Sequence, residues 1–205
     1  MSRIIVFGCG GHARSVVDVI RETCREIEII LVDGGAKDDE MILGCKVLKR
    51  CEPQNEDKYI VAIGDNVQRA KVYQTLQKMT RGLPAAVVSK YAHIGMESVI
   101  GQGTFVAAGT HIGPQACVGD NSIINTGSII EHEAKIGNNT HVAPRTVVCG
   151  RANIGNYVFC GAGSTVIDKI SVCDNVVIGA GAVVRECITE PGIYVGVPAR
   201  RIDSD

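Results

Sequence analysis

Two neighbouring residues in the second half of the chain, His132 and Glu133, put a carboxylate beside an imidazole. Such a carboxylate can fix the tautomer of the imidazole and raise its basicity, as a general base needs in order to take a proton from an amine or a hydroxyl group. Because neighbours along a strand point to opposite faces, contact between these two side chains requires a turn or a bulge. The pair therefore predicts acid–base catalysis, unless the histidine is only a solvated surface group.

The elements around this pair belong to a strict six-residue repeat. From Ile94 to Val184 every sixth residue is Ile or Val, except for Cys160, and small residues recur at fixed places between them. This period fits neither an α-helix nor a hairpin, but it fits a solenoid in which each wall takes six residues and three walls close a coil. The pattern resembles that of the hexapeptide-repeat proteins, which fold as left-handed parallel β-helices.

Residues eighteen apart stack on successive coils of such a solenoid, and this rule adds further candidates. Gly150 lies one coil after His132, where its backbone amide could polarise a carbonyl group beside the base. Ala162 and Ala180 occupy equivalent places, and side chains this small leave a groove that fits a thin ligand such as a pantetheine arm, although they also suit tight turns. His141 lies in the wall that follows His132, as a ligand contact or as a surface residue.

The first 90 residues have an α/β pattern. Strands are expected at 4–7, 27–32, 59–63 and 85–88, and helices at 14–25 and about 67–80. Strand, glycine-rich loop, helix and strand form the front half of a Rossmann unit, and only half of a dinucleotide fold has room here. We therefore expect a Rossmann-like nucleotide-sugar-binding domain at 1–90 and a β-helix domain with a C-terminal tail at 91–205.

Ligand-binding candidates gather at one edge of the predicted sheet. The loop Gly8-x-Gly10-x-x-Ala13 offers bare backbone amides to a phosphate at the start of a helix, although it could also be only a tight turn. Asp33 ends the second strand, where it could bind a ribose or base or merely open a turn. Gly64 ends the third strand at the same edge, and His12 lies within reach of a phosphate.

Composition excludes several classes of function. The net charge of −1 gives no global basic field for nucleic acid, and no apolar run is long enough to span a membrane. The nine cysteines include no CxxC pair, which argues against zinc, and their odd number argues for reduced thiols in the cytoplasm. The N-terminal residues show no signal-peptide pattern, so we expect a cytoplasmic protein without a metal.

Together these motifs resemble the bacterial sugar O-acyltransferases of the sialic-acid O-acetyltransferase type. Within them, the likeness is greatest to the N-acetyltransferases of nucleotide-linked 4-amino sugars, such as UDP-N-acetylbacillosamine N-acetyltransferases. The resemblance covers essentially the whole chain. The stretches that carry it are 8–12, 62–66, 125–127, 130–133, 140–142 and 196–201.

The resemblance implies a role for each candidate. His132 would be the general base and Glu133 the residue that raises its basicity. The acetyl-CoA contacts would be His141, Gly150, Ala162 and Ala180, with the Arg200-Arg201 tail near the CoA phosphates. The nucleotide contacts would be Gly10, Gly11, His12, Asp33, Gly34 and Gly64. Members of this family are homotrimers with active sites between neighbouring β-helices. This chain departs from the family pattern at one position, because it has Gly34 where relatives have a second acid after Asp33.

We therefore expect direct acetyl transfer to the 4-amino group of a nucleotide-linked sugar. UDP is the first candidate nucleotide. O-acetylation of sialic acid by the same residues is the nearest alternative. A non-catalytic β-helix scaffold or nucleotide sensor belongs to another class, and an NAD oxidoreductase is a distant third.

Overall fold

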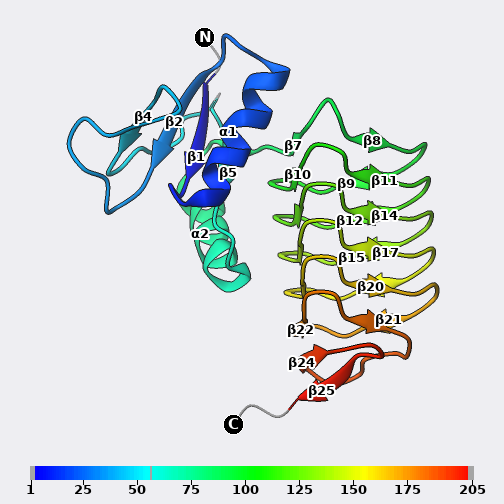
Figure 1. Ribbon diagram of the computed structural model, residues 1–205. Helices are drawn as coiled ribbons and strands as arrows, with labels where there is room; N and C mark the ends of the chain where they lie inside the picture. The colour runs from blue at the N-terminus through cyan, green and yellow to red at the C-terminus, as the bar shows by residue number, and fades with distance from the viewer. Residues whose placement is uncertain (1–2, 56, 203–205) are drawn as a thin grey trace.

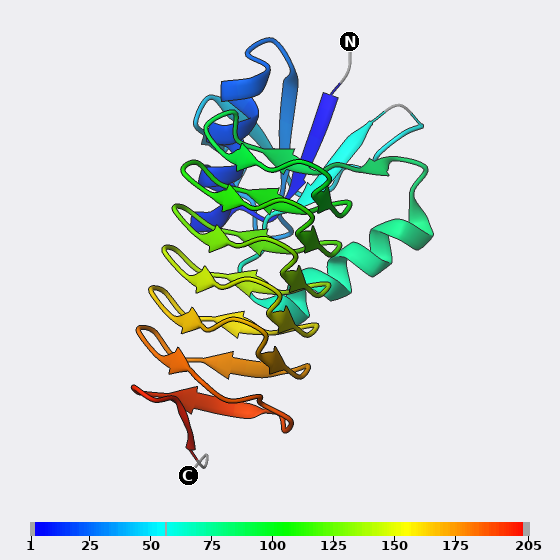
Figure 2. The ribbon, with the colours of Figure 1, turned by 90° about the vertical axis from the view of Figure 1, so that its right-hand side faces the viewer.

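The two halves of the protein have different architectures. The structure, a computed structural model, describes residues 3–55 and 57–202. A small α/β layer lies beside the upper coils of a triangular β-solenoid, whose coils stack in a column down to the C-terminal hairpin (Figures 1 and 2). This arrangement confirms the predicted α/β half followed by a parallel β-helix.

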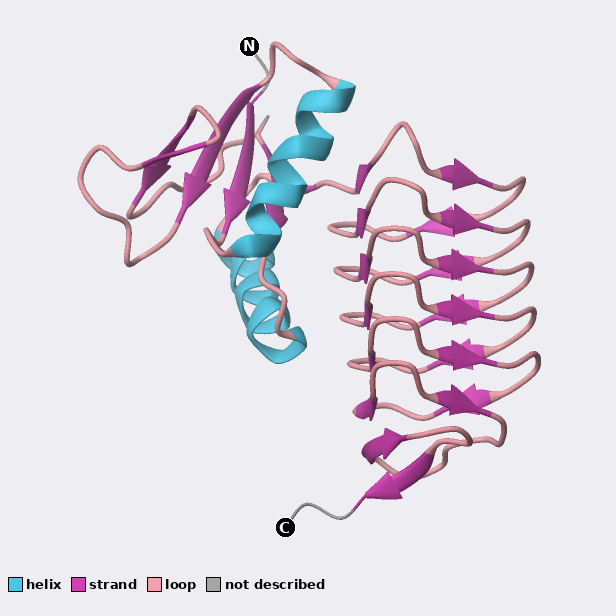
Figure 3. Cartoon of the chain, in the orientation of Figure 1, coloured by secondary structure: helices cyan, strands magenta, loops and turns pink. Residues whose placement is uncertain are grey.

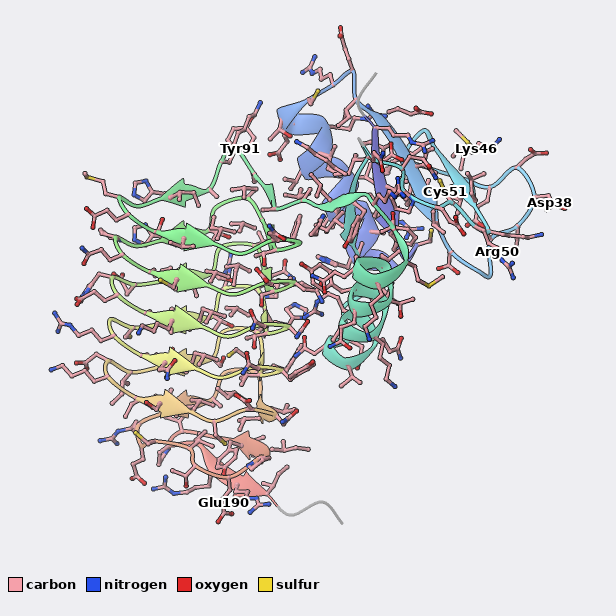
Figure 4. The ribbon with its side chains drawn as sticks, turned by 180° about the vertical axis from the view of Figure 1, so that it is seen from behind. Asp38, Lys46, Arg50, Cys51, Tyr91 and Glu190 are labelled. Atoms are coloured by element: carbon pink, nitrogen blue, oxygen red, sulfur yellow. The ribbon has the colours of Figure 1, made fainter. Side chains whose placement is uncertain are left out.

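The N-terminal sheet has the strand order β3-β4-β2-β1-β5-β6 and is parallel except at β3, which pairs antiparallel with β4. Its strands are β1 (Arg3–Phe7), β2 (Glu28–Val32), β3 (Met41–Ile42), β4 (Cys45–Leu48), β5 (Lys58–Val61) and β6 (Leu83–Pro84). Exposed charged side chains, including Asp38, Lys46 and Arg50, project around its outer edge away from the solenoid (Figure 4). Such charges oppose strand pairing with another molecule.

Two helices cover the two faces of this sheet (Figure 3). Helix α1 (Gly11–Thr23) buries Val16, Val17 and Ile20 in a cluster that also contains solenoid residues such as Phe105 and Ile123. Helix α2 (Asn66–Met79) is capped by the preceding residue, Asp65, whose side chain accepts a hydrogen bond of 2.8 Å from the Gln68 amide. Helix α1 therefore fills the space between the N-terminal sheet and the solenoid.

Three parallel sheets form the walls of the solenoid. Sheet B contains β7 (Val87–Val88), β10 (Phe105–Val106), β13 (Ile123–Ile124), β16 (His141–Val142), β19 (Phe159–Cys160), β22 (Val176–Ile178), β24 (Gly192–Val195) and, antiparallel at its end, β25 (Arg200–Ile202). Sheet C contains β8 (His93–Ile94), β11 (His111–Ile112), β14 (Ile129–Ile130), β17 (Val147–Val148), β20 (Thr165–Val166) and β23 (Val183–Val184). Sheet D contains β9 (Val99–Ile100), β12 (Cys117–Val118), β15 (Lys135–Ile136), β18 (Asn153–Ile154) and β21 (Ser171–Val172).

The six-residue anchors fill the interior of the solenoid. Ile130, Val148 and Val166 stack on sheet C in register, and each is 0% exposed. Burial of a Val or Ile side chain contributes about 1.5–3 kcal/mol, so a continuous column of them holds the coils together. Val88 pairs with Val106 in the same way, so the six-residue repeat begins one step before Ile94.

The outward side chains of sheet B change character down the column. Phe105 and Ile123 are buried against the N-terminal half, whereas His141 and Phe159 are half-buried and Val177 is exposed. The N-terminal half therefore covers the upper part of sheet B, and the lower part remains open as the wall of a cavity.

Three expectations about the first half needed correction. The predicted strand at 85–88 is not part of the N-terminal sheet, because β6 ends at Pro84 and β7 is the first strand of sheet B. The β3–β4 hairpin was missed because its strands are too short to show a pattern. Helix α1 begins earlier than predicted, at Gly11, whereas helix α2 begins at Asn66, as expected. The boundary near residue 90 stays an interpretation.

Candidate active site

His132 and Glu133 lie in the turn between β14 and β15, and their side chains are in contact. Glu133 has a left-handed backbone with φ of 60°, which brings its carboxylate back to its neighbour. The Nδ1–H of His132 donates to Glu133 Oε2 at 3.1 Å. This turn supplies the change of direction that an extended strand would not allow, and the contact leaves Nε2 as the nitrogen free to accept a proton.

The carboxylate of Glu133 has a second partner that the sequence analysis missed. Arg151 Nε donates to the same Oε2 atom at 3.0 Å from the next coil. The hydrogen bond with His132 and the charge of Arg151 hold the pKa of Glu133 below its usual range, so this side chain stays a carboxylate at neutral pH. The eighteen-residue rule that relates His132 to Gly150 also relates Glu133 to Arg151, so a signal for it was present.

Gly150 lies directly against the imidazole of His132. A Cβ atom at Gly150 would lie 2.5 Å from Cε1 and 2.6 Å from Nε2 of His132. Any side chain there would displace the ring, so the site needs glycine for close approach. Within the described residues, the Gly150 amide donates no backbone hydrogen bond.

This turn lies far from the N-terminal half of the same chain. The turns that join sheet C to sheet D form one corner of the prism, at the right-hand edge of Figure 1, whereas the N-terminal half lies on the left against sheet B. His132 therefore does not share a cavity with the nucleotide-binding candidates of its own chain.

His141 lies on sheet B at the seam with the N-terminal half. Its Nδ1–H donates to the Gly64 carbonyl at 3.2 Å, and its Nε2 lies 3.4 Å from Asn125 Nδ2. Burial, followed by the nearby charge of Arg69, lowers the pKa of His141 to about 4. This imidazole is therefore neutral at pH 7, and its ring packs edge-on against Phe159.

A cavity of about 500 Å³ opens at this seam. Its walls come from the start of helix α2 and from the lower part of sheet B. The lining residues are Gly64, Asp65, Asn66, Val67, His141, Tyr157, Phe159 and Val177. Both polar side chains, such as Asp65 and His141, and apolar ones, such as Phe159 and Val177, line it, so the cavity suits a ligand of mixed polarity.

A second cavity, of about 400 Å³, lies at the carboxyl edge of the N-terminal sheet and shares Gly64 with the first. It is lined by Gly8, Cys9, Gly10, Gly11, His12, Asp33, Ala62, Ile63, Gly64 and Gln68. Five of the six predicted nucleotide contacts thus meet in one place. The sixth, Gly34, is exposed and lines neither this cavity nor the adjoining one, where Gly35 takes part instead.

The start of helix α1 forms the floor of this second cavity. Gly10 makes no side-chain capping hydrogen bond, and the first turn of the helix carries no acidic residue. Both Gly10 and Gly11 are exposed, and a Cβ atom at either position would meet nothing within 4 Å, so a ligand can approach this loop closely. Arg14, which the sequence analysis missed, donates to the Gly10 carbonyl and adds positive charge beside the loop. These features suit an anion such as a phosphate.

The imidazole of His12 is half-buried beside the same loop. Burial is the main cause of a pKa lowered to about 3, so the ring is neutral. Its Nε2 is buried without a hydrogen-bond partner among the described residues. A buried polar atom without a partner is costly, and this one borders the cavity where a ligand group could satisfy it.

Ala162 and Ala180 lie one above the other in the turns that join sheet B to sheet C. The Gly181 amide donates to the Ala162 carbonyl at 2.9 Å, and both alanines are exposed. Their small side chains leave open backbone along this corner. They are separated from His132 within one chain, because His132 occupies the corner between sheets C and D.

Other groups contribute less to the site. Burial raises the pKa of the Cys149 thiol, which disfavours a thiolate nucleophile beside Gly150. Arg201 is paired with Glu190 at 2.7 Å, and Arg200 lies 3.7 Å from Glu186, so part of the positive charge of the C-terminal tail is neutralised.

In the described residues no set of three or more His, Cys, Asp or Glu side chains is arranged to hold a metal ion. Neither helix of the described chain has the length and apolar character needed to cross a membrane.

Comparison with known proteins gives a consistent picture. Residues 3–76 match the PglD N-terminal domain family. The chain superimposes on the acetyltransferase domain of PglB from Neisseria gonorrhoeae FA1090 with a TM-score of 0.91, 22% identity, and coverage of 98% of this chain and 99% of the other. The same PglB domain in complex with acetyl coenzyme A gives a TM-score of 0.90, 23% identity, and coverage of 98% of this chain and 98% of the other.

PerB from Caulobacter crescentus, crystallised with CoA and GDP-perosamine, gives a TM-score of 0.85, 26% identity, and coverage of 98% of this chain and 97% of the other. A comparison with curated proteins finds no match. The resemblance predicted from the sequence, to sugar acyltransferases of the hexapeptide-repeat type, is confirmed by these matches.

Proposed function

We propose that this chain, whose residues 3–76 match the PglD N-terminal domain family and whose fold resembles those of PglB and PerB, transfers the acetyl group of acetyl-CoA to the 4-amino group of a nucleotide-linked sugar. The observation that carries the proposal is the contact of His132 with both Glu133 and Gly150. This contact combines a proton acceptor, a fixed tautomer and an open amide in one turn. PerB and PglB add the acyl donor, because they were crystallised with CoA or acetyl-CoA.

In the proposed reaction, Nε2 of His132 takes a proton from the amine as its nitrogen attacks the thioester carbon. The new C–N bond forms, the C–S bond breaks, and the CoA thiolate leaves and is then protonated. The negative charge that develops on the carbonyl oxygen would be stabilised by the Gly150 amide. Glu133 keeps Nδ1 protonated and stabilises the imidazolium ion that forms.

The nucleotide would bind in the cavity at the start of helix α1. The phosphates would contact the amides of Gly10 and Gly11, and His12 and Asp33 would face the remainder of the nucleotide. The sugar would then reach Gly64, which the two cavities share, and the acetyl end of acetyl-CoA would enter the cavity bounded by His141 from the other side. We keep UDP as the first candidate nucleotide and GDP and dTDP as tested alternatives.

A homotrimer would complete the site. His132 and Gly150 occupy the corner between sheets C and D, whereas Ala162 and Ala180 occupy the corner between sheets B and C and His141 lies on sheet B. One chain cannot bring these corners together, but a neighbouring prism can place its corner beside them. The acetyl-CoA arm would then lie along Ala162 and Ala180 of one subunit and face His132 of the next.

Mass spectrometry of possible acceptors tests the proposal. The protein is incubated with acetyl-CoA and, separately, with UDP-, GDP- and dTDP-linked 4-amino sugars and with sialic acid. A mass gain of one acetyl group on a nucleotide-linked amino sugar is the expected result. Acetylation of sialic acid alone would show that the protein is an O-acetyltransferase and would contradict the proposed acceptor. Tight nucleotide-sugar binding without any transfer would contradict enzymatic function and favour a scaffold or a sensor.

A further inference from the structure

Arg69 on helix α2 is a buried cation at the seam between the two halves. It is 1% exposed, and its Nε donates to the Asn121 carbonyl at 2.8 Å. Its Nη2 donates to Asn66 Oδ1 at 2.7 Å, and its Nη1 donates to the carbonyls of Ile63 and Gly64 at 3.0 and 3.2 Å. These acceptors are all neutral oxygens. Burying a charge without a directly bonded carboxylate is expensive, which points to a role beyond packing.

The Gly64 carbonyl connects Arg69 to His141. It accepts from Arg69 Nη1 on one side and from His141 Nδ1 at 3.2 Å on the other. Because a carbonyl oxygen can only accept, this contact requires the proton of a neutral imidazole to lie on Nδ1.

The opposite side of the imidazole gives the same assignment independently. Asn125 Oδ1 accepts from the Thr126 amide at 2.8 Å, so the Asn125 amide group must turn its Nδ2 toward the ring. Nδ2 lies 3.4 Å from His141 Nε2 and has only hydrogens to offer. Nε2 is therefore a hydrogen-bond acceptor.

We propose that Arg69 is a positioning residue for His141, and that by holding the Gly64 carbonyl it fixes the imidazole as the Nδ1–H tautomer with Nε2 as an acceptor. This inference rests on the proposed function, in which the cavity beside His141 takes the reacting end of acetyl-CoA. A ligand that takes the place of Asn125 Nδ2 at Nε2 must then present an N–H or O–H group. The amide N–H of a pantetheine arm has this chemistry, whereas a thioester carbonyl does not.

The charge of Arg69 acts in the same direction as its hydrogen bonds. After burial, Arg69 is the main cause of the lowered pKa of His141, and it also lowers the pKa of the neighbouring His12. Arg69 itself remains a cation, since burial lowers its pKa only to about 10 and Asp65 opposes that shift. A permanent positive charge nearby thus disfavours a second proton on either imidazole.

Nitrogen-15 NMR of histidine-labelled full-length protein tests the tautomer directly. In wild-type protein at pH 7, the long-range couplings of His141 should identify a neutral ring protonated at Nδ1. A ring protonated at Nε2, or a doubly protonated ring, would overturn the proposal without any variant. This measurement needs no acceptor sugar, so it stands or falls apart from the proposed function.

Variants of Arg69 test its part in fixing the ring. Arg69→Gln removes both the charge and the fork of donors, and Arg69→Lys keeps the charge alone. Lys71→Gln, on the exposed side of the same helix, is the matched control. We expect mixed tautomers for His141 in Arg69→Gln, a smaller change in Arg69→Lys, and the wild-type spectrum in Lys71→Gln.

Binding and kinetics separate positioning from simple stability. The expected result for Arg69→Gln is a KM for acetyl-CoA raised about tenfold, the value of one hydrogen bond, with a smaller change in kcat. Calorimetric binding of CoA gives the same comparison if no acceptor sugar reacts. If Arg69→Gln does not fold, Arg69→Lys and the wild-type spectrum decide. A lower melting temperature with an unchanged tautomer and unchanged affinity for acetyl-CoA would show that Arg69 only joins the two halves.

Discussion

His132 and His141 belong to the same β-helix but lie in opposite environments. The side chain of His132 is 49% exposed in a turn and donates to a carboxylate. His141 is half-buried beside the N-terminal half, donates to a backbone carbonyl, and has a pKa lowered to about 4, mainly by desolvation. The first environment suits a group that gains and loses a proton, and the second suits a neutral group that holds its shape. Environment rather than residue type thus separates a proton acceptor from a fixed contact.

The largest expected effect is at the exposed histidine. His132→Ala removes the proposed proton acceptor and should lower kcat by about 10²–10⁴-fold, the usual contribution of general base catalysis, while leaving the fold intact. Release of CoA in the presence of acetyl-CoA and the acceptor measures the rate. His93→Asn, an exposed histidine in the first coil, is the control. Wild-type turnover by His132→Ala would remove the distinction between the two histidines.

Gly150→Ala tests the space beside the base. The added Cβ would lie 2.6 Å from His132 Nε2, so the ring must move. Misplacement on the scale of 1 Å can cost about 10²-fold in rate, and we expect a loss of kcat approaching that size with little change in melting temperature. Cys149→Ser, one residue away, should retain full activity because no acyl-cysteine forms. Full activity in Gly150→Ala would contradict the close packing of the ring.

Glu133→Gln weakens the orientation of the base without removing it. The amide keeps the shape of the side chain but loses the charge that attracts Nδ1–H and Arg151. The expected result is a kcat about tenfold lower, equivalent to losing one charged hydrogen bond. Arg151→Gln should have a smaller effect, since His132 keeps its carboxylate. A larger loss of kcat in Arg151→Gln than in Glu133→Gln would contradict the view that Glu133 is the main residue orienting His132.

The free energy of unfolding in acid should depend on His141, the half-buried histidine. The unfolded chain takes up a proton near the ordinary imidazole pKa of 6.5, whereas folded His141 does so only near 4. Protons therefore favour the unfolded state as the pH falls from 6.5 toward 4, and stability of the order of 2 kcal/mol should be lost across that range.

Denaturant titrations at pH 7.5 and pH 5 measure this loss. His141→Gln should show a smaller difference between the two pH values than wild type. Lys71→Gln, an exposed substitution that changes no histidine, should behave as wild type does. If all three proteins lose the same free energy of unfolding between pH 7.5 and pH 5, His141 does not have the lowered pKa described above.

Sequence alone predicted the solenoid because its period is repeated many times and each anchor is buried for the same reason. The meeting of Gly10, Gly11, His12, Asp33 and Gly64 was predictable because strand ends of a parallel sheet share one edge. The contact of His132 with Gly150 followed from the stacking of successive coils.

Arg69 and the His141 seam could not be found in the same way. Nothing in the polar pattern of helix α2 marks Arg69 as buried, and its partners Asn121 and Gly64 are distant in the chain or offer only backbone atoms. How the two halves pack depends on the apolar outward residues of sheet B, such as Phe105, which periodicity treats as ordinary strand positions. Long-range packing between unlike domains leaves little local signal.

Mixing two inactive variants tests the central claim, that the site is assembled for acetyl transfer from two subunits. His132→Ala removes the base from one corner, and Ala162→Trp blocks the groove at another. Each should be inactive alone. When they are unfolded and refolded together with acetyl-CoA and the acceptor supplied, about a quarter of the sites in randomly assembled trimers should combine two intact corners and recover activity. No recovery from a mixture shown to contain mixed trimers would contradict a site shared between subunits.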